Sequence, residues 1–135
     1  MEVTLVALDW LKCHEEVLWN KVDVLHRVTL QWGCYTRPLL VDSVTGTILD
    51  GHHRYHVGCR LGLKRLPAIL VDYLVDESVT CHVWDSAGMD SLSKQDVIAM
   101  AESDTVYPPK TSRHVTEEAP PPIHVDLKIL MQESD

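Results

Sequence analysis

The sequence predicts an α+β (mixed α/β) domain, and three observations carry this prediction. Short runs rich in β-branched residues and leucine, such as VTLVAL at residues 3–8 and LPAILVDY at residues 66–73, are typical of strands. Segments of helical periodicity, such as residues 20–32, lie between them. With 135 residues, 45% of them apolar, the chain is long enough for one core, so we expect a single domain over residues 1–135.

The individual elements follow from turn and cap residues. Asn20 is a predicted N-cap and Gly33 a predicted helix end, and a second helix lies between Gly51 and Gly62. Ser93 begins a third helix with a capping-box pattern in which Asp96 replaces the usual glutamate. The expected helices are residues 20–32, 52–61 and 94–101. The expected strands are residues 3–8, 38–42, 47–50, 66–73, 79–84 and 123–127, with a hairpin turn at residues 43–46 and a basic, hydroxyl-rich loop at residues 110–115.

Charge and composition narrow the class of function. The formal net charge is -8, so the averaged surface field repels phosphate backbones, and we expect no nucleic-acid partner. The four cysteines form no C-x-x-C pair and lie mostly in apolar contexts, which favours buried thiols in a reducing, cytoplasmic compartment. No apolar run approaches the roughly 18 residues of a membrane span, and no signal-peptide pattern is visible, so we expect a soluble, unprocessed protein without a membrane partner.

The stretch ILDGHHRYHVG at residues 48–58 carries the strongest chemical signal. A strand that ends at Asp50 and turns through Gly51 into a helix directs backbone N–H groups and the positive helix end toward a ligand, which favours an anion. His52, His53 and Arg54 in the first turn can donate charge-assisted hydrogen bonds to phosphate oxygens. Asp50 would repel a phosphate unless a divalent metal bridges them or it accepts a proton, so we interpret Asp50 as metal-linked or catalytic.

A zinc site is a weaker interpretation of the same stretch. His52 and His56 lie four residues apart on one helical face, which is zinc-ligand spacing. A third ligand and the glutamate of a metalloprotease motif are both missing, so this pair by itself does not predict zinc. A purely structural, polar first turn of a helix also remains open.

Four separated stretches resemble the ParB/sulfiredoxin superfamily, and within it the free serine kinases. They are His14-Glu15, GCYTRPLL at residues 33–40, LDGHHRY at residues 49–55 and YPPKTSRHV at residues 107–115, in the family's order. The resemblance implies a small domain with a mixed sheet flanked by helices. Sulfiredoxin itself is disfavoured because its reactive cysteine is replaced here by His52. A partition protein is disfavoured because this short acidic chain has no room for a helix-turn-helix module.

The resemblance also implies roles for individual residues. Glu15 corresponds to the family's general base, with Asp50 binding the metal or assisting that base. The expected nucleotide-binding residues are Gly51, His52, His53, Arg54 and Lys110. The expected substrate-binding residues are Trp84, Thr111, Ser112, Arg113 and His114. Larger family members carry an extra segment where only residues 85–92 stand here, so closure over the substrate would rely on a second subunit, as in a homo-oligomer, or on a more open site.

The predicted function is therefore that of a phosphotransferase. It would make O-phospho-L-serine from free L-serine and a nucleotide phosphate donor, ATP or ADP, together with Mg²⁺. The alternative from a different class is a non-catalytic, nucleotide-sensing ParB-like module that regulates a partner. Threonine or homoserine as the acceptor, and ATP or ADP as the donor, are not distinguished by the sequence.

Overall fold

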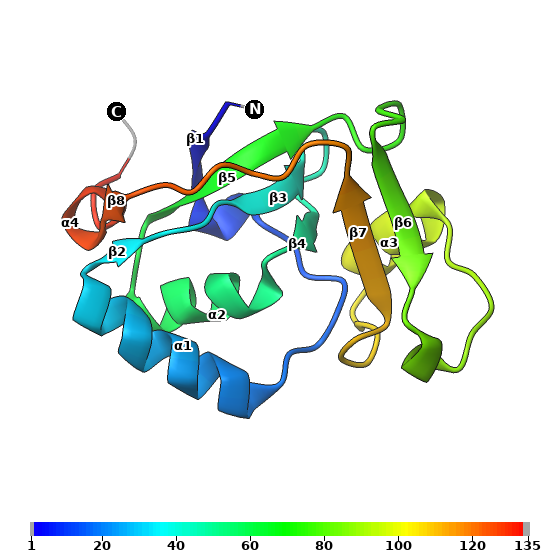
Figure 1. Cartoon of the computed structure of the whole chain (residues 1–135), viewed down its shortest axis with the longest axis horizontal. Helices are drawn as coiled ribbons and strands as arrows, with labels where there is room; N and C mark the ends of the chain where they lie inside the picture. The colour runs from blue at the N-terminus through cyan, green and yellow to red at the C-terminus, as the bar shows by residue number, and fades with distance from the viewer. Residues whose placement is uncertain (1, 134–135) are drawn as a thin grey trace.

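A mixed four-stranded sheet forms the centre of the computed structural model, which describes residues 2–133 (Figure 1). The strands lie in the order β1 (Thr4–Ala7), β5 (Arg65–Val71), β3 (Leu39–Asp42) and β4 (Ile48–Asp50). β3 is parallel to β5, whereas β1 is antiparallel to β5 and β4 is antiparallel to β3. The predicted α+β (mixed α/β) class is confirmed.

The turn between β3 and β4 forms as the short polar residues predict. Oδ2 of Asp42 accepts hydrogen bonds from the backbone N–H and the hydroxyl of Thr45, at 3.0 and 2.6 Å. Gly46 has a φ of 78°, and a Cβ there would lie 2.5 Å from the carbonyl oxygen of Trp10. Glycine is required at this position both by the backbone conformation and by the close approach of the N-terminal segment.

Two helices, α1 (Trp19–Trp32) and α2 (His52–Leu61), pack against each other on one side of the sheet (Figure 1). Val22 of α1 and Val57 of α2 are fully buried and share a core with Leu66 of β5. Apolar residues at helical spacing form this core because their burial removes hydrocarbon from water. The packing fixes the N-terminus of α2 next to the segment that leads into α1.

The two helices end as predicted, but α1 begins differently. Gly33 and Gly62 adopt left-handed conformations, with φ of 70° and 68°, and terminate α1 and α2. Asn20 is not the N-cap, because the helix already begins at Trp19 and is preceded by Leu18, which provides no side-chain cap. The backbone N–H of Leu18 instead donates to Nε2 of His53 at 3.2 Å. A contact between distant segments therefore holds the start of α1.

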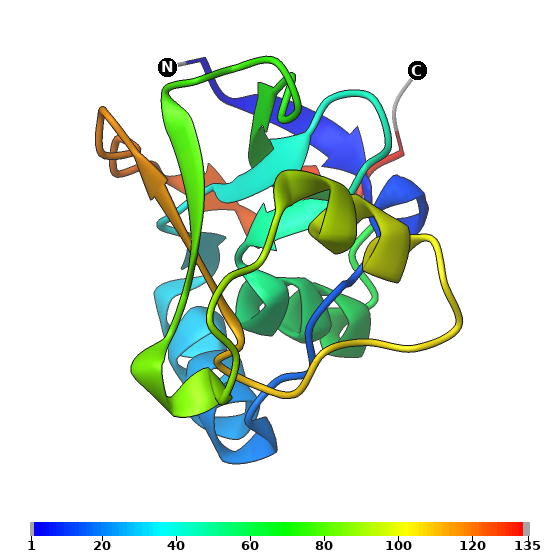
Figure 2. The same ribbon diagram turned by 90° about the vertical axis from the view of Figure 1, so that its right-hand side faces the viewer.

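A second layer consists of β6 (Val79–Val83), β7 (Ser112–Thr116) and α3 (Lys94–Ala101), shown together in Figure 2. β6 and β7 form an antiparallel pair beside the main sheet. A second core joins this layer to the sheet, and its buried members include Tyr73 and Val97. The capping box of α3 is present as predicted: Ser93 Oγ accepts from the N–H of Asp96, and the Asp96 carboxylate accepts from the N–H of Ser93.

The prediction of a loop at residues 110–115 is wrong for most of its length. Lys110 lies in a turn with Pro109, but Ser112–Thr116 forms β7, in register with Val79–Val83. The strand has no apolar pattern in the sequence, because most of its side chains are basic or carry hydroxyl groups. The strand forms because β6 supplies a ladder of backbone hydrogen-bond partners, and alternate residues of β7 still face inward.

The remaining elements are short. They are β2 (Cys34–Tyr35), β8 (Val125–Asp126), α4 (Leu127–Leu130) and the 3-10 turns η1 (Leu8–Trp10) and η2 (Asp85–Ala87). The strand expected at residues 123–127 is reduced to the two residues of β8, which pair with β2. Cys34 is buried, Cys13 and Cys81 are partly buried, and Cys59 is exposed, so the prediction of buried thiols holds in part. Among residues 2–133, no helix has the length and apolar character needed to cross a bilayer.

Candidate active site

A polar cavity of about 220 Å³ lies where the loop before α1, the start of α2 and the start of β7 meet. Ten of the twelve residues predicted for the site line this cavity, the exceptions being Arg54 and Thr111. The lining residues are Glu15, Leu18, Leu49, Asp50, Gly51, His52, His53, Trp84, Pro109, Lys110, Ser112, Arg113 and His114. Segments that are up to almost one hundred residues apart in sequence therefore converge.

Glu15 is held in the cavity wall by backbone and side-chain contacts. The N–H of Tyr107 donates to the carbonyl of His14 and the N–H of Glu16 donates to the carbonyl of Tyr107, each at 2.8 Å. Oε1 of Glu15 accepts from the backbone N–H of Ser112 at 2.7 Å and from its hydroxyl at 2.9 Å. Burial raises the pKa of Glu15, and the bonds from Ser112 oppose that rise.

The turn at Asp50 and Gly51 connects β4 to α2 at the edge of the cavity. Gly51 has a φ of 111°, and a Cβ there would lie 2.8 Å from Cγ of Leu39. This conformation lets the chain enter α2 immediately, so the first backbone N–H groups of the helix lie beside the cavity. The side chain of Asp50 is 68% exposed, which leaves its carboxylate accessible to a ligand.

Arg54 lies beneath this turn rather than in the cavity. Its Nη2 donates to the carbonyl of Pro38 at 3.3 Å and is 3.7 Å from Oδ2 of Asp50. It lines two neighbouring cavities together with Arg37. Burial lowers the pKa of the Arg54 guanidinium, while Asp50 opposes this effect. From this position, Arg54 can act on a ligand through the charge and orientation of Asp50.

His52 and His53 use one ring nitrogen each to hold the Glu15 segment. Nε2 of His52 accepts from the backbone N–H of His14 at 3.1 Å, and Nε2 of His53 accepts from that of Leu18 at 3.2 Å. Each acceptor nitrogen must carry a lone pair, so the rings are neutral with the proton on Nδ1. Burial lowers the pKa of both histidines, which agrees with neutral rings. Contacts of either ring with a phosphate would therefore come from Nδ1–H of a neutral imidazole.

The segment after Pro109 forms the opposite wall. Lys110 has a φ of 59°, and the hydroxyl of Thr111 is directed away from the cavity, toward the carbonyl of Pro108 at 2.7 Å. Nε1 of Trp84 donates to the carbonyl of Ser112 at 3.0 Å, and the guanidinium of Arg113 lies 5.5 Å from the Trp84 ring. The aromatic ring and cation of this wall suit a small zwitterion.

Sequence reasoning missed two buried side chains that support this wall. Oη of Tyr73 is 2.8 Å from Nε2 of His114, and the His14 ring is fully buried between the cavity wall and β4. His14 precedes Glu15 in the sequence, but the sequence analysis assigned no role to its side chain. A tyrosine just after a strand and a lone histidine are usually core residues, so their types alone gave no signal.

A divalent cation fits this site only when it is bound together with a nucleotide. Within residues 2–133, no three His, Cys, Asp or Glu side chains cluster as a metal site. Asp50 offers one exposed carboxylate at the cavity. Mg²⁺ is commonly held by one or two carboxylates and by substrate phosphates, so Asp50 fits an Mg²⁺ ion that arrives with a nucleotide.

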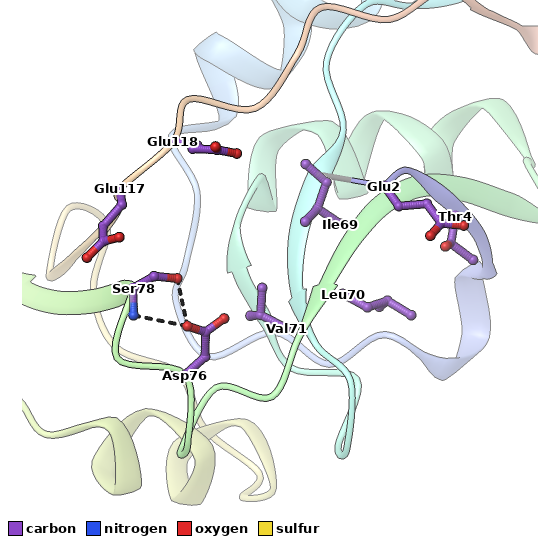
Figure 3. A pocket seen from close by; sticks show the side chains of 9 residues that line it. All are labelled: Glu2, Thr4, Ile69, Leu70, Val71, Asp76, Ser78, Glu117 and Glu118. Atoms are coloured by element: carbon purple, nitrogen blue, oxygen red, sulfur yellow. Dashed lines mark hydrogen bonds between the residues drawn. The ribbon is translucent and has the colours of Figure 1, made fainter.

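A larger cavity, of about 470 Å³, lies on another part of the molecule (Figure 3). Its wall is formed by β5 and the neighbouring segments, and it contains the carboxylates of Glu2, Asp76, Glu117 and Glu118. The Asp76 carboxylate is bonded to the N–H and hydroxyl of Ser78. None of the predicted site residues lines this cavity, and its negative charge is unfavourable for a phosphate.

The chain is similar in sequence to curated proteins and similar in fold to solved structures. No protein-family model matches the chain. An ATP-dependent L-serine kinase from Staphylothermus marinus is 33% identical over 98 residues, which cover 70% of this chain and 38% of that protein. An ADP-dependent L-serine kinase from Thermococcus kodakarensis is 29% identical over 98 residues, covering 70% of this chain and 40% of that protein. The chain thus spans about two fifths of the length of these relatives.

The solved structures agree with the sequence comparison. A variant of free serine kinase in complex with ADP superposes with a TM-score of 0.85 at 18% identity, covering 96% of this chain and 94% of that chain. Free serine kinase in complex with AMP also gives a TM-score of 0.85, at 19% identity, covering 95% of this chain and 93% of that chain. At this identity the superposition shows the fold. The chain thus has the fold of free serine kinase and is similar in sequence to L-serine kinases.

Proposed function

We propose that the protein transfers a phosphoryl group from ATP or ADP to the hydroxyl of free L-serine, with Glu15 as the general base. The product is O-phospho-L-serine. The proposal is supported by the kinase relatives and by one geometric observation. Glu15 and the turn at Asp50 line the same cavity, and a hydrogen bond from His14 to His52 joins their two segments.

Glu15 suits the role of base for a physical reason. Both bonds from Ser112 go to Oε1, and they hold the carboxylate in the cavity wall, where it can take the proton of the substrate hydroxyl. Burial raises the pKa of Glu15, which makes the carboxylate a stronger base than an exposed glutamate. Its fixed position in the wall lets it act without reorganisation.

Phosphoryl transfer otherwise requires alignment and charge neutralisation. The nucleotide phosphates would lie at the N-terminus of α2, against the N–H groups after Gly51 and the Nδ1–H groups of His52 and His53. Lys110 would add a positive charge, and Arg54 would keep Asp50 oriented. Mg²⁺ would neutralise phosphate charge when Asp50 holds it.

The serine side of the cavity would be the wall formed by Trp84 and the start of β7. Arg113 is the cation available for the carboxylate of the amino acid, and its guanidinium is stacked near Trp84. Ser112 and His114 line the same wall. Thr111 would contribute by fixing the turn through its bond to Pro108, since its hydroxyl does not line the cavity.

A product assay tests the proposal directly. Folded protein is incubated with L-serine, Mg²⁺ and ATP or ADP in turn, and O-phosphoserine is measured by mass spectrometry. We expect serine-dependent phosphoserine with one or both nucleotides, and parallel reactions with threonine and homoserine define the acceptor. Complete absence of phosphorylated amino acid with every nucleotide, from protein that is folded by circular dichroism, would rule the kinase out.

The second candidate is a nucleotide-sensing module without turnover. It is favoured by the exposure of the cavity's Trp84 and Lys110 side and by the short segment at residues 85–92, which leaves little chain to cover a substrate. Tight ADP binding by calorimetry with no phosphoserine would favour this module. A DNA-binding role is opposed by the net charge of -8, and we expect no gel shift at physiological salt.

A further inference from the structure

Three side chains form a continuous line of hydrogen-bond contacts from the cavity into the core. Oε1 of Glu15 is 2.9 Å from Oγ of Ser112, and the same Oγ is 2.9 Å from Nε2 of His14. The other nitrogen of the His14 ring, Nδ1, is 2.8 Å from the carbonyl oxygen of Ile48. The line therefore begins at the proposed base and ends at a backbone carbonyl of β4.

The protons available to this line can be counted. A carbonyl oxygen only accepts, so Nδ1 of His14 must carry a proton and donate to Ile48. In a neutral ring, Nε2 then has a lone pair and accepts. Ser112 has one hydroxyl proton but two acceptors, Nε2 of His14 and the ionised Oε1 of Glu15. With Glu15 ionised, one of the two contacts of the Ser112 hydroxyl therefore lacks a proton.

One additional proton completes the line. When Glu15 is protonated on Oε1, it donates to Oγ of Ser112, and the Ser112 hydroxyl donates to Nε2 of His14. All three contacts are then hydrogen bonds. Because His14 and Ser112 are buried and Glu15 is partly buried, the missing bond of the ionised state is costly and the completed state is favoured.

We propose that His14, acting through the hydroxyl of Ser112, is a positioning residue that strengthens Glu15 as a base by supplying the final acceptor of this line. The inference rests on the proposed role of Glu15. In the reaction, the substrate O–H bond breaks as its oxygen bonds to phosphorus, and the bond from phosphorus to the nucleotide's leaving oxygen breaks. The proton forms a new O–H bond on Oε1 of Glu15. The Ser112 hydroxyl then turns from Glu15 to His14, so no further proton donor or acceptor is needed.

The surroundings support a neutral His14 as this acceptor. Burial lowers the pKa of His14 to about 4, whereas burial raises that of Glu15. The rings of His52 and His114 face His14 with centroids at 4.7 and 5.8 Å. No carboxylate is among the groups bonded to His14 in the described structure that would stabilise an imidazolium ion. The added proton therefore resides on Glu15, and His14 stays neutral.

The remaining charged groups near the line are at the cavity rim. Asp50, His53, Lys110 and Arg113 line the same cavity as Glu15. Their charges act on Glu15 whether or not Ser112 links it to His14. A test must therefore separate the link from the general field of the cavity.

Nuclear magnetic resonance of the ring nitrogens provides such a test without any turnover. The ¹⁵N resonances of His14 and the ¹³C carboxyl resonance of Glu15 are followed against pH in the full chain. We expect the Nδ1–H tautomer at neutral pH, and a shift of the Nε2 resonance that has the same midpoint as the Glu15 titration. In Ser112→Ala, which keeps the backbone N–H to Glu15, the Nε2 response at the Glu15 midpoint should disappear. An Nε2–H tautomer, or a response unchanged in Ser112→Ala, would overturn the proposal.

A double-substitution cycle gives a second measurement. His14→Asn can keep a donor toward Ile48 but removes the acceptor facing Ser112, so the Glu15 midpoint should fall by about half a pH unit or more. The same substitution in the Ser112→Ala background should produce no such fall, because the link is already broken. His56→Asn on α2 is the control and should leave the midpoint unchanged. If His14→Asn does not fold, the Ser112→Ala measurement decides alone.

This test separates two kinds of failure. Phosphoserine formation without coupling between Glu15 and His14 would overturn this inference and leave the kinase in place. Coupling without phosphoserine would overturn the kinase and leave the line of contacts established. In an active protein, the acid limb of the kcat profile against pH should move with the Glu15 midpoint in His14→Asn.

Discussion

The backbone N–H of His14 donates to Nε2 of His52 at 3.1 Å, and this bond joins two segments that are 38 residues apart in sequence. It places the residue before Glu15 against the first residue of α2. The ring of His52 is therefore a structural clamp as well as a wall of the cavity.

Removal of the His52 ring should destabilise the protein more than removal of a neighbouring ring. His52→Ala leaves the buried N–H of His14 without an acceptor, which costs about 1–3 kcal/mol in the free energy of unfolding. His56→Ala on the same helix removes a half-buried ring that packs edge-on against Trp19 and should cost less. Urea denaturation at pH 7.5 compares the two variants, and equal losses would contradict the clamp.

The free energy of unfolding should fall as the pH drops from about 6.5 toward 4. Burial lowers the pKa of His14 to about 4 and that of His114 to about 3, so below pH 6.5 the unfolded chain binds more protons than the folded one. Each such histidine contributes up to about 1.4 kcal/mol per pH unit. The raised pKa of Glu15 acts in the opposite direction and offsets part of this loss near its own titration.

Urea midpoints at pH 7.5, 6 and 5 measure this slope. His114→Gln should reduce it by about one proton, which corresponds to about 1.4 kcal/mol per pH unit. His82→Gln, on the exposed face of β6, is the control for the removal of a histidine side chain at the surface. A slope that is the same in His114→Gln and in the unsubstituted protein would contradict the neutral, buried state of His114.

Glu15→Gln should abolish phosphoserine formation while preserving the fold. The amide oxygen can still accept the N–H of Ser112, but the group no longer takes a proton, so we expect a fall of about 10²–10⁴ in kcat. Glu16→Gln is the matched control, because the Glu16 carboxylate bonds to the N–H of Val17 and does not line the cavity. A Glu15→Gln protein with the full rate would show that another group is the base.

Gly51→Ala should weaken both the fold and nucleotide binding. At a φ of 111°, alanine is strained, and its Cβ would meet Cγ of Leu39 at 2.8 Å and Nη2 of Arg54 at 3.0 Å. We expect a loss of about 1–3 kcal/mol in the free energy of unfolding. Gly62→Ala at the other end of α2 has a positive φ but open space and should cost about 1 kcal/mol. Thermal denaturation and ADP calorimetry distinguish the two.

Asp50→Asn should change the metal dependence of nucleotide binding with little effect on stability. The side chain is 68% exposed, so the amide replaces the carboxylate without a packing defect. We expect calorimetry of ADP with and without Mg²⁺ to show a metal-dependent gain in affinity that is lost in Asp50→Asn. Asp72→Asn, exposed after β5, is the control. Retention of the full Mg²⁺ effect in Asp50→Asn would exclude Asp50 as the metal ligand.

Local chemistry explains the elements that could be predicted from the sequence. Gly33 and Gly62 end their helices because only glycine readily adopts the left-handed conformation there. The capping box at Ser93 and the turn after Asp42 depend on groups within three residues. The polar motif at residues 48–58 identified the cavity because its side chains and helix N-terminus are sequence neighbours.

Contacts between distant segments decided the rest. β7 could not be predicted because β6, rather than apolar side chains of its own, makes Ser112–Thr116 a strand. The chemical groups near Glu15 and Asp50 can be identified from the order of residues along the chain. The hydrogen bond between His14 and Ser112, 98 residues apart, could not be predicted in this way, because it depends on the packing of β4 against β7.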